Sequence, residues 1–350
     1  MTGSQAAHHG YAPRNFVPPG DENLSMVYFP DPLASPFRRD GALLPRDKFS
    51  DPQTTLEGKE RGFVPLEGLE TLWFNTGTLC NLACATCYIE SSPTNDALIY
   101  LTHAEVTRFL DEVEDNGLPT KLIGFTGGEP FMNREVIAML EEALKRGFEI
   151  LVLTNAMRPM RRFETELLSL LERYGDRLTM RVSLDHHTQA AHEAERGEDT
   201  WAKAIDGLRW LARHGFRIAI AGRQLAGETM QEATAGYRAL LLELGIKLEI
   251  DDPEALVIFP EMDARLDTPE VSEECWDILG LKKESVMCSS SRMVVHRRGE
   301  KTARVVACTL LPYEDGFDLG ADLTEAAGDV RLNHPHCSRF CVLGGASCGG

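Results

Sequence analysis

The stretch TGTLCNLACATCYIE, from Thr76 to Glu90, places Cys80, Cys84 and Cys87 within eight positions in the spacing C-x3-C-x2-C. A structural zinc site uses four protein ligands, and this stretch holds no histidine or fourth cysteine. Three thiols on one short loop therefore indicate a metal centre with one open position. Thiolates of this density favour an iron–sulfur cluster or zinc. Buried free cysteines and a zinc site completed from elsewhere in the chain are the alternatives.

The composition is that of an ordinary soluble globular protein. The chain has 350 residues, 43% hydrophobic and 26% charged, which suits one large domain or two moderate ones. Its formal net charge of −18 argues against a nucleic-acid partner. No apolar run approaches the roughly 20 residues that cross a bilayer, and the first residues do not resemble a secretory signal. We therefore expect a cytoplasmic protein with no membrane partner, in which nine cysteines favour metal or redox chemistry over disulfides.

From residue 70 onward, apolar segments alternate with amphipathic ones. Thr102 and Glu105 have the spacing of a capping box, and Gly117 is placed to end the same helix. The alternation predicts βαβ units around a parallel sheet, either doubly wound or a partial barrel. The expected strands cover 70–76, 121–130, 148–156, 177–186, 216–222 and 247–252, and the expected helices cover 101–117, 134–147, 164–175, 201–215 and 230–245.

The unusual sequences lie where these strands end. The cysteine loop follows the first strand, TGGEP (126–130) ends the second, TNA (154–156) the third and SLDH (183–186) the fourth. Ligands of parallel sheets collect at the carboxyl ends of the strands. The sequence therefore predicts a single site at that edge.

These motifs, in this order, resemble the radical S-adenosylmethionine (radical SAM) superfamily over about residues 70–250. The resemblance implies an α/β fold, a partial (β/α)6 barrel, in which Cys80, Cys84 and Cys87 hold a 4Fe-4S cluster whose open iron chelates SAM. It also implies SAM contacts from Gly127, Gly128 and Glu129 beside the SAM ammonium, and from Tyr88, Asn155, Ser183, Asp185 and Arg196. Strand-end caps or surface ion pairs are the plainer interpretation of the last four. The chain departs from many relatives in placing Thr86, not an aromatic residue, before the third cysteine.

A second group of cysteines lies near the carboxyl end. Cys288 and Cys308 flank an expected β-hairpin with the turn RRGEK (297–301), and Cys337, Cys341 and Cys348 follow. This arrangement resembles the SPASM and twitch extensions of radical SAM enzymes and implies one auxiliary 4Fe-4S cluster with one cysteine to spare. We expect Cys341 and Cys348 to close the cluster and Cys337 to be the spare. A zinc knuckle is the alternative, His334 and His336 are optional ligands of either, and Cys275 is expected in the core.

Together these features predict an irregular amino-terminal arm (1–66), a radical SAM core (67–252) and an auxiliary-cluster domain (253–350). The resemblance implies an enzyme that reductively cleaves SAM to a 5′-deoxyadenosyl radical and abstracts hydrogen from a peptide or small molecule. The auxiliary cluster would accept an electron or bind the substrate, and a flavodoxin or ferredoxin would supply the reductant. The alternatives are a non-catalytic electron-transfer or binding protein, and a sulfur- or methyl-transfer variant.

Overall fold

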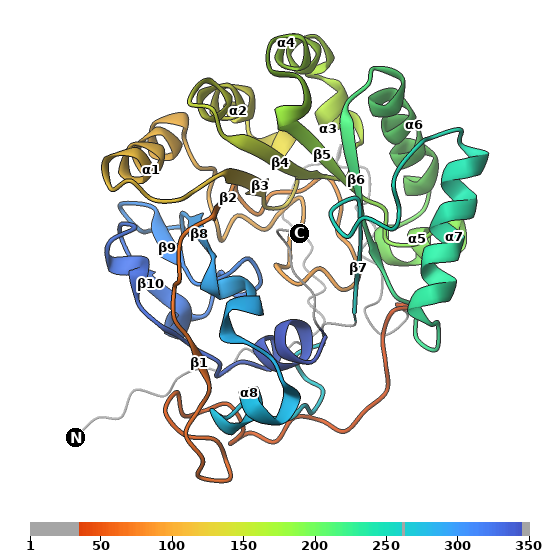
Figure 1. Ribbon diagram of the computed structural model, residues 1–350. Helices are drawn as coiled ribbons and strands as arrows, with labels where there is room; N and C mark the ends of the chain where they lie inside the picture. Colours follow the sequence, from red (N-terminus) through yellow and green to blue (C-terminus); the bar gives the residue numbers. More distant parts are fainter. Residues whose placement is uncertain (1–34, 261–262, 345–350) are drawn as a thin grey trace, which may run out of the picture.

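The protein is built on one nine-stranded sheet, seen in the computed structural model, which describes residues 35–260 and 263–344 (Figure 1). The strand order is β10-β9-β8-β2-β3-β4-β5-β6-β7. Neighbours from β2 to β7 are parallel, which confirms the predicted α/β barrel architecture. These strands are β2 (Thr71–Asn75), β3 (Leu122–Thr126), β4 (Glu149–Thr154), β5 (Leu178–Ser183), β6 (Arg217–Arg223) and β7 (Leu256–Phe259).

Helices connect the parallel strands and cover the outer, convex face of the sheet (Figure 1). The first of them shows why the sequence folds this way. Thr102 and Glu105 form the predicted capping box, and Gly117, with a φ of 60°, follows the helix in the left-handed region. These helices are α1 (His103–Asp115), α2 (Val136–Lys145), α3 (Arg158–Arg161), α4 (Glu164–Tyr174), α5 (Gln189–Arg196), α6 (Thr200–Arg213) and α7 (Met230–Glu243). The short helix α8 (Glu274–Leu279) follows β7 and lies apart from them (Figure 1). No helix in the described part of the chain is both long and apolar enough to span a membrane.

The last strand of the barrel lies later than predicted. The expected strand at 247–252 is wrong, because these residues lead into a turn in which the Asp252 side chain accepts a hydrogen bond from the Glu254 amide at 2.9 Å. The strand that completes the sheet is β7, which pairs with β6. Its four residues are too few to display a period, and Asp251, Asp252 and Pro253 favour a turn just before it.

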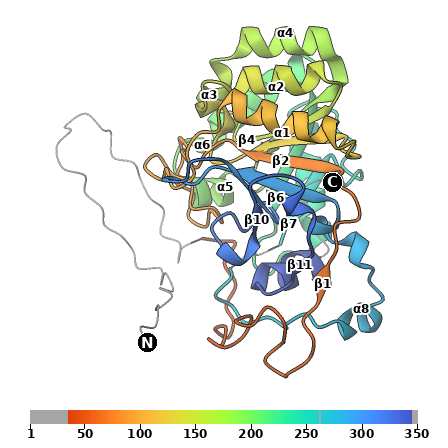
Figure 2. The ribbon, with the colours of Figure 1, turned by 90° about the vertical axis from the view of Figure 1, so that its left-hand side faces the viewer.

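The carboxyl-terminal part extends the same sheet. The predicted hairpin is confirmed as β8 (Ser291–Val295) and β9 (Arg304–Val306), followed by β10 (Asp318–Gly320). β8 pairs in parallel with β2, so the hairpin adds to the barrel edge. Figure 2 shows the helices on one side of the sheet and this part on the other.

The described part of the arm is tied to the body. Its short strand β1 (Phe63–Val64) pairs with β11 (Val330–Arg331). Phe37 and Phe49 are buried, and the buried Arg61 guanidinium pairs with Glu270 at 2.7 Å. The described part of the arm therefore packs against the body and contributes one strand.

Side chains alternate between the two faces of the sheet and divide the core in two. Leu72 and Phe74 of β2 point to the cluster under the helices, whereas Trp73 joins a second cluster with Val306 and Phe340 of the carboxyl-terminal part. Trp73 is fully buried, and its ring lies directly over Gly124 of β3. A Cβ atom on Gly124 would lie 2.2 Å from that ring. The Trp73 ring therefore leaves room only for glycine at position 124.

We expect Gly124→Ala to lower the free energy of unfolding by about 1–3 kcal/mol, because the added methyl group must displace the Trp73 ring in a closely packed core. Chemical denaturation measures the difference. Gly328→Ala is the matched control, since a Cβ there meets nothing within 4 Å and its φ is −69°. Equal losses in the two variants would contradict the tight contact.

Candidate active site at the carboxyl ends of the strands

The cysteine loop runs from the end of β2 and directs backbone amides at its own sulfurs. The Leu82 amide donates to Cys80 Sγ at 3.4 Å, and the Ser91 amide donates to Cys87 Sγ at 3.3 Å. Hydrogen bonds of this kind favour the thiolate over the thiol and tune bound clusters. The loop is thus shaped for anionic sulfur ligands.

Burial acts in the opposite direction on the three thiols. Burial, and next the nearby Glu129 carboxylate, raise the pKa of Cys80 to about 12. Burial also raises the pKa of Cys84 and Cys87. These thiols therefore need a positive centre among them to ionise, and a bound iron–sulfur cluster would supply it.

The glycine turn after β3 packs directly on the cysteine loop. The Gly128 amide donates to Gly77 O at 2.9 Å, and a Cβ on Gly128 would lie 2.3 Å from Leu79 O. Gly127 has a φ of 134°, which only glycine adopts readily. The contacts of these glycines with SAM stay a prediction. The structure shows that Gly128 packs against the backbone of the cysteine loop.

Glu129 joins the ends of two strands. Its side chain, 1% exposed, accepts hydrogen bonds from Thr154 Oγ1 at 2.9 Å, from the Asn155 amide at 2.8 Å and from the Phe131 amide at 3.2 Å. Burial raises its pKa to about 7, against these hydrogen bonds. These contacts show that Glu129 supports the site from behind. Its predicted contact with the SAM ammonium stays a prediction.

Asp185 and Arg196 form a bidentate ion pair beside the cysteines. Arg196, the last residue of α5, donates to Asp185 after β5 at 2.6 and 3.1 Å. Burial opposes ionisation of Asp185, but the Arg196 charge outweighs it and lowers the Asp185 pKa. The pair holds a guanidinium fixed at the wall of the site.

Most of the predicted residues line one cavity of about 1060 Å³, counting the space at its open mouth. Asn155 at the end of β4 also lines it and donates to Asn81 Oδ1 at 2.9 Å. Glu129 is not among the lining residues. The predicted residues that line the cavity are Cys80, Cys84, Cys87, Tyr88, Gly127, Gly128, Asn155, Ser183, Asp185 and Arg196.

An ionic network that the sequence analysis missed holds the loop from the other side. Glu195 Oε1 accepts hydrogen bonds from the Thr86 amide at 2.8 Å and from Thr86 Oγ1 at 2.7 Å. Arg223, at the end of β6, lies 2.8 Å from the same oxygen and donates to Thr86 Oγ1 at 2.7 Å. Ser35 of the arm donates to Glu195 Oε2 at 2.7 Å. The departure at Thr86 therefore has a role: its hydroxyl completes this network.

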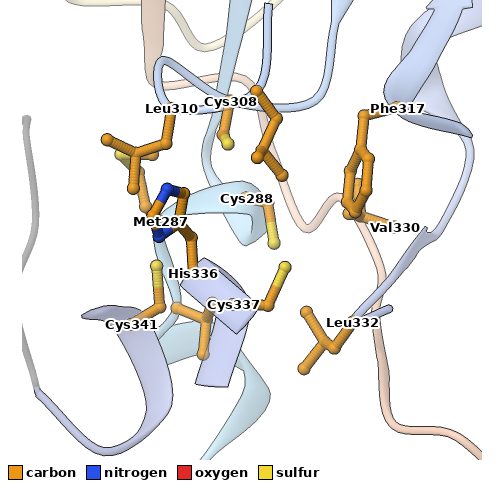
Figure 3. Close-up of a pocket in the computed structure, with 12 residues that line it drawn as sticks. Met287, Cys288, Cys308, Leu310, Phe317, Val330, Leu332, His336, Cys337 and Cys341 are labelled. Carbon is orange, nitrogen blue, oxygen red and sulfur yellow. The ribbon is translucent and has the colours of Figure 1, made fainter. Parts of the chain in front are cut away.

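A second, smaller cavity of about 350 Å³ lies in the carboxyl-terminal part (Figure 3). The sulfurs of four cysteines face its interior, and His336 lines it as well (Figure 3). Burial raises the pKa of Cys288 to about 11 and raises that of Cys337. The lining cysteines are Cys288, Cys308, Cys337 and Cys341.

Two of these cysteines lie on one π-helical turn, Cys337–Val342. Cys337 was expected to be the spare cysteine, but the structure places it in the cavity beside Cys341. Cys348, expected to close the cluster, lies outside the described residues. His334 is half-buried next to His336 and does not line the cavity. Cys275, expected in the core, is half-buried on α8, and its sulfur accepts a hydrogen bond from the Ser272 amide.

The spacing of the sulfurs bears on the metal. Among the described residues, no three cysteine sulfurs lie within 4.8 Å of one another. A tetrahedral zinc site with Zn–S bonds of about 2.3 Å has sulfur–sulfur edges of roughly 3.8 Å. Both cysteine groups are therefore spread more widely than a single zinc ion requires.

Comparison with known proteins agrees with this geometry. Residues 74–234, from β2 into α7, match the radical SAM superfamily. This region of the chain is a radical SAM domain. The resemblance inferred from the motifs is thus confirmed, and so is the prediction of an enzyme. The assignment of individual residues to the clusters and to SAM stays a prediction.

The chain aligns with only part of each of two curated relatives. The chain is 34% identical over 143 residues to the antilisterial bacteriocin subtilosin biosynthesis protein AlbA of Bacillus subtilis (strain 168), covering 41% of this chain and 30% of AlbA. It is 33% identical over 76 residues to the S-adenosylmethionine-dependent nucleotide dehydratase of Selenomonas ruminantium, covering 22% of this chain and 26% of the dehydratase. The chain therefore matches less than a third of either relative.

The fold of the chain is also similar to that of a solved protein. SuiB of Streptococcus suis bound to S-adenosylmethionine superposes with a TM-score of 0.52 at 12% identity, covering 73% of this chain and 63% of SuiB. SuiB bound to the precursor peptide SuiA gives a TM-score of 0.51 at 14% identity over the same shares. At this identity the likeness shows the shared fold.

We expect Glu195→Ala to weaken the hold of the cysteine loop on iron by about 10–100-fold, the usual effect of losing a supporting contact behind the ligands. Iron release to a chelator under anaerobic conditions measures it. Glu193→Ala is the control on the same helix, because Glu193 contacts Gln189 and Trp201 rather than the loop. Identical release from both variants would show that the network does not support the loop.

Proposed function

We propose that this protein is a radical SAM enzyme that modifies a peptide and carries a second iron–sulfur cluster in its carboxyl-terminal cavity. The observation that carries the proposal is the large cavity, because it joins three cysteines, a fixed guanidinium and an apolar wall in one space. When bound to Cys80, Cys84 and Cys87, a 4Fe-4S cluster supplies the electron that converts SAM to methionine and a 5′-deoxyadenosyl radical, which abstracts hydrogen from substrate.

The polar residues of the chain would bind and orient SAM. Arg196 offers a positive charge for the SAM carboxylate, and Asp185 holds that guanidinium in place with two hydrogen bonds. Ser183 and Asn155 line the same cavity at the ends of β5 and β4 and offer hydrogen bonds to the ribose or the carboxylate. The ends of β4 and β5 would thus hold the flexible SAM molecule in one orientation.

The apolar wall of the large cavity is evidence for a peptide substrate that places an apolar side chain near the reacting position. Leu153 and Phe259 come from the barrel, and Leu310 and Phe340 come from the carboxyl-terminal part. The Phe259 and Phe340 rings lie 5.6 Å apart. AlbA is named for bacteriocin biosynthesis, and SuiB was crystallised with a precursor peptide. These two names support a peptide, whereas the other curated relative is named for a nucleotide.

The second cluster would lie next to this substrate space. Leu310 lines both cavities, so the two share a residue of their walls. Cys288, Cys308, Cys337 and Cys341 supply four thiolates without Cys348. A cluster there is close enough to the substrate space to accept an electron from the substrate or to bind it, with a flavodoxin or ferredoxin as the external reductant.

We expect Cys84→Ala to abolish 5′-deoxyadenosine formation from SAM by the reduced, cluster-loaded protein, while circular dichroism remains that of a folded chain. The reason is local: the cysteine lies on a strand-end loop outside the sheet. Cys275→Ala is the control, since Cys275 lines neither cavity. Normal 5′-deoxyadenosine formation by the Cys84 variant would refute the catalytic assignment. Transfer of deuterium from a labelled peptide into 5′-deoxyadenosine would identify the substrate.

We expect anaerobically reconstituted protein to hold about eight irons per chain, and a variant lacking Cys80, Cys84 and Cys87 to keep about half of them. Replacing Cys288 and Cys337 with alanine should remove the other half and leave the first cluster in place. Iron analysis and electron paramagnetic resonance of the variants measure both. Zinc in place of iron in the triple variant would refute the auxiliary cluster.

A further inference from the structure

A group of metal-ligand side chains lies outside both cavities. His186 and His187 follow β5, and Glu228 lies just before α7, on the side of the barrel where α5 and α7 are drawn (Figure 1). One ligand atom from each of the three lies within 4.8 Å of the other two. None of them lines the large cavity at the strand ends or the smaller cavity in the carboxyl-terminal part.

Part of this group is explained by ordinary hydrogen bonding. His186, 2% exposed, lies with Nε2 3.3 Å from Glu228 Oε1. Its Nδ1 lies 2.8 Å from Thr188 Oγ1 and accepts a hydrogen bond from the Thr188 amide at 3.1 Å. The other Glu228 oxygen accepts a hydrogen bond from the Leu225 amide at 3.2 Å. The His186–Glu228 contact by itself would serve as a clip between two loops.

His187 is not explained in this way. Its Nδ1 is buried and has no hydrogen-bond partner among the described residues. The ring is nonetheless fixed, because the His186 ring centroid lies 3.9 Å away and the Tyr237 ring contacts it edge-on. A Cβ on Gly236 of α7 would lie 2.3 Å from the same ring. A fixed, buried nitrogen without a partner is costly unless something binds it.

We propose that His186, His187 and Glu228 form a binding site for one divalent transition-metal ion of the zinc class. Two imidazoles and one carboxylate are ligands that zinc accepts, with a fourth position for water. The ion would replace the long His186–Glu228 contact and supply the partner that His187 Nδ1 lacks.

The site would fasten a loop that borders the active site. Asp185 directly precedes His186, and its carbonyl accepts a hydrogen bond from the Arg223 amide at 2.8 Å. A metal ion joining the loop after β5 to the loop before α7 would therefore hold the backbone that carries the Asp185–Arg196 pair. This role is structural and does not depend on the reaction or substrate proposed above.

The test uses the full chain with its clusters loaded, so that cysteine sites are occupied, and Zn²⁺ as the probe. After desalting, we expect one zinc per chain with unchanged iron. Zinc X-ray absorption should show nitrogen and oxygen neighbours at about 2.0–2.1 Å and no sulfur at about 2.3 Å. Absence of retained zinc, or zinc bound by sulfur alone, would overturn the proposal.

Three variants locate the ion. Glu228→Gln keeps the size of the side chain and its hydrogen-bonding capacity, and His187→Ala removes the ring, so we expect each to weaken zinc binding more than about a hundredfold, beyond the usual effect of an outer contact. His103→Ala is the control, because His103 lies 3.9 Å from Glu142 as a single histidine beside a single carboxylate. Zinc should also raise the melting temperature of the parent and control proteins but not of the Glu228 variant. Retained nitrogen-bound zinc in the folded Glu228 variant would place the ion elsewhere.

Discussion

The contact between Gly128 and the Leu79 carbonyl is the constraint on which the active site depends. With 2.3 Å between that oxygen and the place where a Cβ would lie, the glycine turn and the cysteine loop touch backbone to backbone. The Glu129 amide donates to the same carbonyl at 3.2 Å, which fixes Cys80 one residue later in the chain. The Glu129 carboxylate then reaches Thr154 and the Asn155 amide. One chain of contacts thus links the ends of β2, β3 and β4.

The opposite side of the loop is held by charge. Glu195 and Arg223 are both buried, and a buried charge that loses its partner destabilises a protein by about 3–5 kcal/mol. The pair is therefore stable only while it is complete, and Thr86 is the part of the loop that joins it. A backbone contact on one side and an ionic network on the other therefore hold the loop that carries the three sulfurs.

The sequence predicted what depends on local spacing. The period of the helices, the capping box at Thr102 and the C-x3-C-x2-C loop each lie within one short segment, so pattern alone was sufficient. Glu195 and Arg223 were missed because their role depends on contacts more than 100 residues from the loop in sequence. The position of Arg223 at a strand end was the available signal.

The misplaced last strand has a different cause: β7 has four residues and follows a turn, and it is defined by pairing with β6 rather than by its own pattern. Cys337 was expected to be the spare because spacing along the chain does not show that a π-helical turn carries it toward the same cavity as Cys341.

The sheet itself sets the relation between the two cysteine groups. β2 and β8 are parallel neighbours, with Thr71 opposite Ser291. The cysteine loop follows the carboxyl end of β2, whereas Cys288 precedes the amino end of β8, so the two groups begin at opposite ends of one strand pair, roughly 13 Å of strand apart for the five residues of β2. β9 runs antiparallel to β8, with Val306 opposite Met293, and this returns the chain to Cys308 beside Cys288. The chain then continues to Leu310, which lines both cavities. Strand direction therefore both separates the two cysteine groups and brings their cavities to a shared wall, so the carboxyl-terminal part shapes the space in which a substrate would lie.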